Sequence, residues 1–196
     1  MAKIRIPLFP LHNVLFPGGL LPLRVFEPRY LEMISTCMKR GTGFGVALIL
    51  SGSEVGEAAK TYDIGSFVRI VDWTMRDDGL LGITVQCEGR FRILETEVQS
   101  NQLVYADVEL LDEQPQQALP AQYAAAVDLL RDIIARVGGH YTELEPQYDD
   151  PLWVSGRLAE LLPIELLQKQ HMLQMDDPLQ RLERLCAMWD CMESEE

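Results

Sequence analysis

Alternation of apolar and polar positions dominates the first part of the chain. It predicts β-strands, since successive side chains of a strand point to opposite faces. The run Arg90-Phe-Arg-Ile-Leu94 is an instance, with one face expected to be buried and the other wet. The strands expected on this basis are Ile4–Phe9, Leu20–Val25, Phe44–Leu50, Ser66–Thr74, Leu80–Glu88, Arg90–Glu97 and Val104–Leu110. Many short strands favour a closed or folded-over antiparallel sheet, because a flat sheet of this length would leave exposed edges.

Two turns are expected among these strands. Asp77-Asp-Gly79 carries the Asp-Gly signal of a hairpin turn and joins the strand-like runs on either side of it. Gly89 separates two further runs in the way that a turn separates the arms of a hairpin.

One helix is expected to interrupt the strands. It begins at Pro28, since proline fits the first helical position, where a missing N–H costs nothing. The glycines of Gly41-Thr-Gly43 end it. Its apolar residues recur at helical spacing and predict a buried stripe of Tyr30, Leu31, Ile34 and Met38.

The second part of the chain has helical periodicity throughout. It follows a polar, proline-bearing linker, Asp112–Pro120. Helices are expected over Tyr123–Val137, from the cap Asp150-Pro151 to Leu162, from Pro163 to Gln174, and after the cap Asp177-Pro178. The predicted fold class is therefore α+β: an N-terminal twisted antiparallel β-subdomain, a pseudo-barrel with one helix, over residues 1–112. A C-terminal helical bundle follows over residues 113–196.

The net charge of the chain limits the kinds of molecule that it is expected to bind. The 196 residues include 17 Lys+Arg and 30 Asp+Glu, a net charge of −13. This excess argues against nucleic acid and against anionic membrane, because both require a basic surface. Residues 115–196 hold 6 basic and 15 acidic residues, so most of the excess lies in the helical part. The β-rich part is closer to neutral.

The ends and the cysteines indicate the compartment. No signal peptide opens the chain, and no run approaches the 18 apolar residues of a membrane span. Cys37, Cys87, Cys186 and Cys191 form no Cys-x-x-Cys pair, so we expect reduced thiols and no metal site. A cytoplasmic protein without cofactors is the prediction.

Motifs that would carry catalysis are missing from the sequence. No glycine-rich loop precedes a lysine as in a Walker A motif, and no Gly-x-Ser-x-Gly elbow occurs. Lys169 is expected on a polar helix face, which does not suit a Ser/Lys dyad. Paired aspartates lie at turns and helix starts, where they bond backbone N–H groups. The sequence predicts no catalytic, cofactor or metal residues, and hence no enzyme.

Apolar residues remain as candidates for binding. The stretch Pro7–Leu23 holds four prolines and many large hydrophobic residues, most of them expected in the core. Some of it is a candidate for an exposed patch that takes up extended peptide, with Phe16 as the chosen contact. Trp73 and Met75 precede the Asp77–Gly79 turn and are better placed for exposure. Methionine and tryptophan at a strand end suit contacts with varied partners.

The same N-terminal stretch resembles a known family. Pro7-Leu-Phe-Pro-Leu11, Val14-Leu-Phe-Pro-Gly18 and Leu21-Pro-Leu-Arg-Val-Phe-Glu-Pro-Arg-Tyr30 are similar to the signature of the Lon protease N-terminal (substrate-binding) domain. Asp150–Pro163 and Arg181-Leu-Glu-Arg-Leu185 resemble its helical half. The resemblance implies a β-subdomain followed by a helical bundle, a role in recognising substrates, and no catalytic residues. It implies a free-standing, bacterial-type member without ATPase or protease domains.

Within that signature, Arg24, Glu27 and Arg29 lie close together where a strand leads into a helix. We expect buried ion pairing there to hold the helix against the sheet, as a structural junction.

These observations predict a non-catalytic module that binds protein or peptide through apolar surface on the β-subdomain. A role in protein quality control or regulated proteolysis is the expected context. Two alternatives stay open at this point. One is a scaffold or regulator that binds a specific folded partner, and the other is a hydrolase with an unrecognised site.

Overall fold

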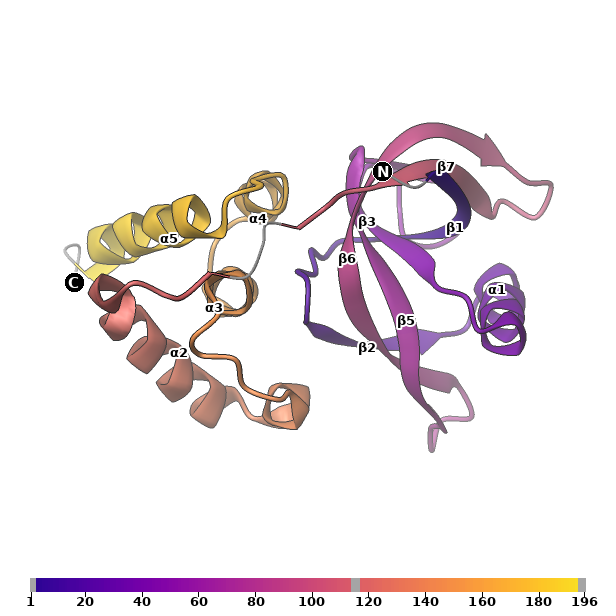
Figure 1. Cartoon of the computed structure of the whole chain (residues 1–196). Helices are drawn as coiled ribbons and strands as arrows, with labels where there is room; N and C mark the ends of the chain where they lie inside the picture. Colours follow the sequence, from indigo (N-terminus) through magenta and orange to yellow (C-terminus); the bar gives the residue numbers. More distant parts are fainter. Residues whose placement is uncertain (1–2, 114–116, 194–196) are drawn as a thin grey trace. The chain divides into compact units, whose positions relative to one another are not determined.

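The computed structural model describes residues 3–113 and 117–193, the last four by their backbone alone. It divides into two compact units, Met1–Asp112 (the β unit) and Glu113–Glu196 (the helical unit), which Figure 1 colours from indigo to yellow. The predicted linker lies partly outside the described residues. The β unit contains β1 (Lys3–Leu11), β2 (Leu20–Val25), α1 (Pro28–Arg40), β3 (Phe44–Ser51), β4 (Lys60–Thr61), β5 (Ile64–Met75), β6 (Leu81–Val98) and β7 (Val104–Leu110).

Five strands of the β unit close into a barrel. Their order is β1-β7-β6-β5-β3, and β3 pairs back onto β1. This closure confirms the predicted pseudo-barrel and leaves β2 as a sixth strand beside β6. The sheet is antiparallel except at its closure, where β1 and β3 are parallel. The predicted antiparallel pairing holds for the rest of the sheet, and β1 and β3 differ because the chain returns through the crossover helix α1 rather than through a hairpin.

The turn predicted at Gly89 does not exist. Leu81–Val98 is one continuous strand of 18 residues. Gly89 pairs with Phe67 while Cys87 pairs with the next residue, Val68, so the glycine marks a bulge in the ladder with β5. Bulges bend a strand, and β6 uses this bend to pass from β2 on one side to β7 farther along. A glycine inside an apolar run is compatible with either a turn or a bulge.

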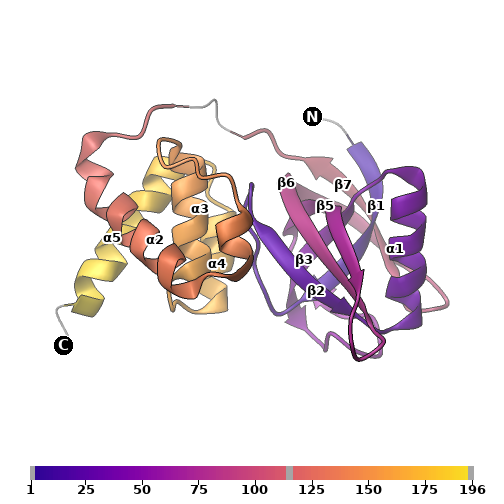
Figure 2. The same cartoon turned by 90° about the horizontal axis from the view of Figure 1, so that it is seen from below.

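The turn predicted at Asp77–Gly79 is confirmed. It joins β5 to β6, with the Arg76 N–H donating to the Leu80 carbonyl over 3.0 Å. Gly79 takes a φ of +77°, which glycine adopts without strain. The resulting long hairpin runs beside α1, and β5 lies between β6 and α1 in both views (Figure 1, Figure 2).

Helix α1 has the predicted ends but a shifted apolar face. It starts at Pro28 and ends at Gly41, whose φ is +62°. Its buried side chains include Tyr30, Met33, Ile34 and Cys37, and they face the strands. Leu31 and Met38, expected in this stripe, are exposed.

The helical unit contains η1 (Ala121–Tyr123), α2 (Ala124–Val137), η2 (Gly139–Glu143), α3 (Pro151–Leu161), α4 (Leu166–Leu173) and α5 (Pro178–Glu193). The two predicted caps are present, since Asp150 and Asp177 each accept a backbone N–H two residues on, over 2.9 Å. Helix α4 starts at Leu166 rather than at Pro163, because Glu165 and Gln168 form a capping box there. Helix α3 is buried along most of its length and contacts both α2 and α5.

Candidate functional site

The described residues carry no constellation that would hold a metal. No group of three His, Cys, Asp or Glu side chains gathers among them. The cysteines Cys37 and Cys87 are buried and Cys186 is partly buried, and the side chain of Cys191 lies outside the described residues. Within the described chain, no helix combines the length and apolar character needed to cross a bilayer.

Lys169 is not on the polar face predicted for it. Its side chain is half-buried, and its ammonium donates to the Glu160 carbonyl over 2.7 Å. Burial lowers the pKa of this lysine. Its bonding partner is a backbone carbonyl, so the position serves to tie α4 to the end of α3.

Phe16 does not belong to an exposed patch. Its side chain is 0% exposed, and the residues on either side of it, Leu15 and Pro17, are buried as well. The buried hydroxyl of Ser66 on β5 donates to the Leu15 carbonyl, which anchors this segment to the barrel. The structure therefore contradicts the placement of Phe16 on a peptide-binding surface, because its side chain is shielded from solvent.

Trp73 and Met75 lie where the sequence placed them, on exposed strand surface. They are 57% and 64% exposed, and both lie near the end of β5. Val71 on the same strand is also exposed, as is Met38 on α1. We call these four residues, Met38, Val71, Trp73 and Met75, the β5 edge surface.

A hollow joins the two elements of the β5 edge surface. It lies between the last turn of α1 and β5 and has a volume of about 250 Å³. Its lining includes the exposed Met38 and Trp73, the thiol-bearing Cys37, and the charged Arg69 and Asp72. The lining therefore combines apolar side chains with a few polar and charged groups.

The apolar face of β5 is a continuation of the core. Trp73 pairs with Ile83, and Met75 pairs with Leu81. Directly paired residues project to the same face of a sheet, and Ile83 belongs to the core under α1. The β5–β6 hairpin thus extends beyond the end of α1, which covers the rest of this face. Trp73 and Met75 lie on the uncovered part and are exposed to solvent.

Charges at the hollow are partly neutralised. Arg69 pairs with Glu88 at 2.7 Å and also donates to the Gly41 carbonyl at the end of α1. The carboxylate of Asp72 is exposed and makes no hydrogen bond or ion pair with the described residues. The charge in the hollow that is open to a partner is therefore negative.

The predicted junction forms with two of its three residues. Arg29, which is buried, pairs with Glu27 at 3.1 Å and donates to the Gln102 carbonyl over 2.8 Å. Glu27 also accepts the N–H of Gly56. These contacts tie the start of α1 to the loop after β3 and to the turn between β6 and β7.

Arg24 is separate from that junction. Its side chain is exposed and pairs with Asp78 in the β5–β6 turn at 3.0 Å. Hydrogen bonding to the Leu80 N–H and the nearby charge of Arg24 hold the pKa of Asp78 below its usual range. Arg24 lies on β2, which ends at Val25, whereas Glu27 and Arg29 lie at the start of α1, so the motif spans two elements.

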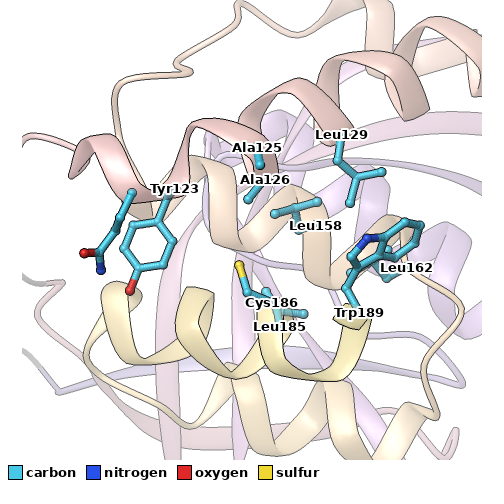
Figure 3. Close-up of a pocket in the computed structure, with 10 residues that line it drawn as sticks. Tyr123, Ala125, Ala126, Leu129, Leu158, Leu162, Leu185, Cys186 and Trp189 are labelled. Atoms are coloured by element: carbon cyan, nitrogen blue, oxygen red, sulfur yellow. The ribbon is translucent and has the colours of Figure 1, made fainter. Parts of the chain in front are cut away.

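The helical unit has a hollow of its own. Its volume is about 460 Å³, and α2, α3 and α5 surround it. Figure 3 shows Leu158 and the Cys186 thiol pointing into it, with Tyr123 at one end and Trp189 at the other. The sequence did not predict this site, since the helical spacing of its lining residues indicates only that they are buried between helices.

Comparison with known proteins identifies relatives of the whole described chain. The family model of the ATP-dependent protease La (LON) substrate-binding domain matches residues 5–189. The crystal structure of a Lon N-terminal domain protein from Xanthomonas campestris is 36% identical, with a TM-score of 0.77. That match covers 94% of this chain and 98% of the other. The N-terminal domain of Mycobacterium avium complex Lon protease shares the fold at 14% identity, with a TM-score of 0.63.

Curated relatives are longer than this chain. The Lon protease of Escherichia coli K12 is 27% identical over 203 residues, which cover 98% of this chain and 25% of that protein. The Lon protease of Anaeromyxobacter dehalogenans is 25% identical over 177 residues, which cover 86% of this chain and 21% of that protein. This chain spans only about a fifth to a quarter of the curated relatives that it matches.

Proposed function

This chain belongs to the ATP-dependent protease La (LON) substrate-binding domain family, and from that premise we propose that it binds polypeptide through the β5 edge surface. It acts as a non-catalytic module. The polypeptides it takes up are extended or unfolded segments, which present apolar side chains together with free backbone groups.

The observation that carries this proposal is the exposure of Trp73 and Met75 beside a hollow. Scattered exposed apolar residues are common on proteins, but here two large ones share a face of β5, and one of them, Trp73, lines a concavity. Methionine adapts to varied shapes, and tryptophan supplies a large contact area, so the pair suits partners of varied sequence. These properties match a domain that must accept many clients.

Charge supports a preference among clients. The chain carries a net charge of −13, and the open charge in the hollow is that of Asp72. Like charges across an interface disfavour binding, whereas opposite charges speed association. Neutral or basic segments are therefore the clients that this surface would take up more readily than acidic ones.

The biological context follows from the relatives. They are named Lon proteases, and this chain corresponds to a minor part of their length. We propose that the chain recognises polypeptides in protein quality control or regulated proteolysis. Its contribution is recognition, and Lys169, whose ammonium is bound by the Glu160 carbonyl, has a structural role.

Replacing Trp73 with serine is expected to weaken binding of a fluorescent, unfolded polypeptide roughly 30-fold. This corresponds to about 2 kcal/mol, the loss seen when an anchoring tryptophan is truncated. Folding should not change, since substitutions of exposed residues alter stability by less than about 0.5 kcal/mol. Fluorescence anisotropy titrations of both proteins measure the effect.

Val137→Ser is the matched control for this experiment. Val137 lies on α2 and is 57% exposed, the same exposure as Trp73, but it belongs to the helical unit. Its replacement should leave binding unchanged. Equal losses in the two variants, or tight binding by Trp73→Ser, would place the binding surface elsewhere. An absence of saturable binding by the unaltered chain, across a broad peptide library, would overturn the proposed function.

A further inference from the structure

The backbone of β5 has an open edge beside the β5 edge surface. Strand β3 pairs with β5 only as far as the pair Phe44 and Val68. From Arg69 to Met75, the strand pairings among the described residues are all with β6. A strand edge of this kind presents a row of unpaired N–H and C=O groups.

The hydrogen bonds of β6 show which of its residues face β5. Cys87 donates its N–H to the Gly19 carbonyl and accepts the N–H of Gly18, so its backbone groups point toward β2. Successive residues of a strand direct these groups to opposite sides. Thr84 and Gly82, at odd spacing from Cys87, therefore direct theirs toward β5.

The open groups of β5 can be assigned by the same alternation. Thr84 and Gly82 pair with Asp72 and Thr74, whose backbone groups consequently bond to β6. Trp73 and Met75 alternate with these residues, and so their N–H and C=O groups point away from β6. The two residues with exposed apolar side chains are thus also the two with outward-facing backbone groups.

The open edge is a position that β3 would occupy if it were longer. Helix α1 ends at Arg40, with Gly41 as its cap, and β3 begins only at Phe44. The hollow lies at this place, with Met38 on its helical side and Trp73 on its strand side. A second strand could therefore continue the line of β3 along β5, with the end of α1 next to it.

Strands β2 and β5 both pair with β6. Of these two strands, β5 has the edge that is less protected against the addition of another strand. Strand β2 contains Pro22, and proline has no N–H to offer to an added strand. The segment of β5 from Arg69 to Met75 contains no proline, and its irregularity is a bulge near Val71. Natural sheets blunt edges with proline, charge and bulges. This edge lacks proline, and its last part, Trp73–Met75, has neither a charge nor a bulge.

We propose that this chain captures polypeptide as an added β-strand on β5, an inference that rests on the function proposed above. The occupant is an extended segment with apolar residues at alternate positions, which pack on Trp73 and Met75. Residues between them face the side of Asp72, where a neutral or basic side chain fits best. Main-chain hydrogen bonds are independent of sequence, which explains how one site could serve many clients.

A second copy of the chain fits the same edge less well. Pairing two β5 edges would bring together two Asp72 carboxylates and two proteins of net charge −13. Like charges facing each other across paired strands are destabilising. An uncharged or basic extended peptide carries no such penalty, and it is therefore the occupant to which we commit.

Amide hydrogen exchange on the whole chain tests strand addition at single residues. The probe is a capped synthetic peptide of alternating valine and lysine, added at saturating concentration. Exchange of the Trp73 and Met75 N–H groups should slow by 10-fold or more. The N–H groups of Asp72 and Thr74, which already bond to β6, should change much less. A peptide of alternating valine and glutamate is the charge-reversed control and should bind at least 10-fold more weakly.

N-methylation of the peptide provides an independent measurement. Methylating alternate backbone nitrogens in one register should abolish binding, because those N–H groups bond β5, whereas methylation in the other register should be tolerated. Binding without protection of Trp73 and Met75, and without a register effect, overturns strand capture but leaves the proposed function standing. An absence of saturable binding to any peptide overturns the proposed function itself. Protection of both N–H groups without peptide, rising with protein concentration, shows that a second copy covers the edge and overturns our choice of occupant.

Discussion

Replacing Arg181 with methionine is expected to destabilise the helical unit by about 3–5 kcal/mol, because three acceptors lose their donor and each buried unsatisfied group costs about 1–3 kcal/mol. Arg181 lies in the first turns of α5 and is fully buried. Its guanidinium donates to the carbonyls of Met172 and Met175 and to the Ser155 hydroxyl, over 2.9–3.2 Å. Methionine fills similar space but leaves those acceptors without these donors, which costs more than the loss of packing.

The size of the effect follows from where those acceptors lie. Two of them belong to the end of α4 and the turn after it, and Ser155 lies on α3. One side chain of α5 therefore holds two other helices in place. A unit of this size has a total stability of about 4–13 kcal/mol, so the variant should be largely unfolded in mild denaturant. Hydrogen exchange in urea, resolved by peptide mass, follows each unit separately.

The same helix offers the control for this substitution. Arg184 lies one turn after Arg181 and is exposed. Arg184→Met should change the free energy of unfolding by less than about 0.5 kcal/mol. The β unit should keep its exchange protection in both variants. A loss in Arg181→Met no larger than that in Arg184→Met would show that the network does not stabilise the unit.

Elements with strong local signals were predicted almost to the residue. The strand Leu20–Val25 and the start of α1 at Pro28 have the bounds expected from sequence. Asp150 and Asp177 cap their helices as expected. In each case the signal is a proline, a cap or an alternation that acts over a few residues, so the sequence contains all the information needed.

Features that depend on contacts between residues far apart in the chain could not be predicted from local sequence signals. Glycine at position 89 is compatible with a turn or with a bulge. The bulge forms because β2, β5 and β7 pair with β6 along its length and keep it one continuous strand. The parallel pairing of β1 with β3 likewise depends on barrel closure. Phe16 is an apolar residue in a proline-rich stretch, and its burial depends on parts of the chain that local sequence does not specify.

The candidate site also contains residues of both kinds, some predicted from a local signal and some whose position depends on distant parts of the chain. Trp73 and Met75 could be placed on exposed surface because a turn signal follows them closely, and hairpin ends protrude. Met38 could not, since helical spacing predicted a buried stripe that included it. Its exposure depends on how α1 rotates over the sheet, with Met33 and Cys37 inward instead. The β5 edge surface is thus a product of a helix shorter than the hairpin that it covers.

Replacing Arg29 with methionine is expected to destabilise the β unit by about 3–5 kcal/mol, because removing one member of a buried ion pair leaves its partner desolvated and uncompensated. Arg29 and Glu27 are both largely shielded from water, and Arg29 also lies over the Tyr30 ring at 4.6 Å. The substitution leaves the Gln102 carbonyl without its donor. Urea unfolding followed by exchange of β-unit peptides gives the change in free energy.

Arg24→Met separates this effect from a general loss of positive charge. Arg24 belongs to the same sequence motif, but its pair with Asp78 is exposed to solvent. Exposed pairs contribute about 0–1 kcal/mol, so this variant should unfold close to the unaltered chain. Increasing salt should diminish the Arg24 effect and leave most of the Arg29 effect, since buried pairs are screened less. If the two variants lose equal stability, the buried contacts of Arg29 with Glu27 and Gln102 do not hold the start of α1 in place.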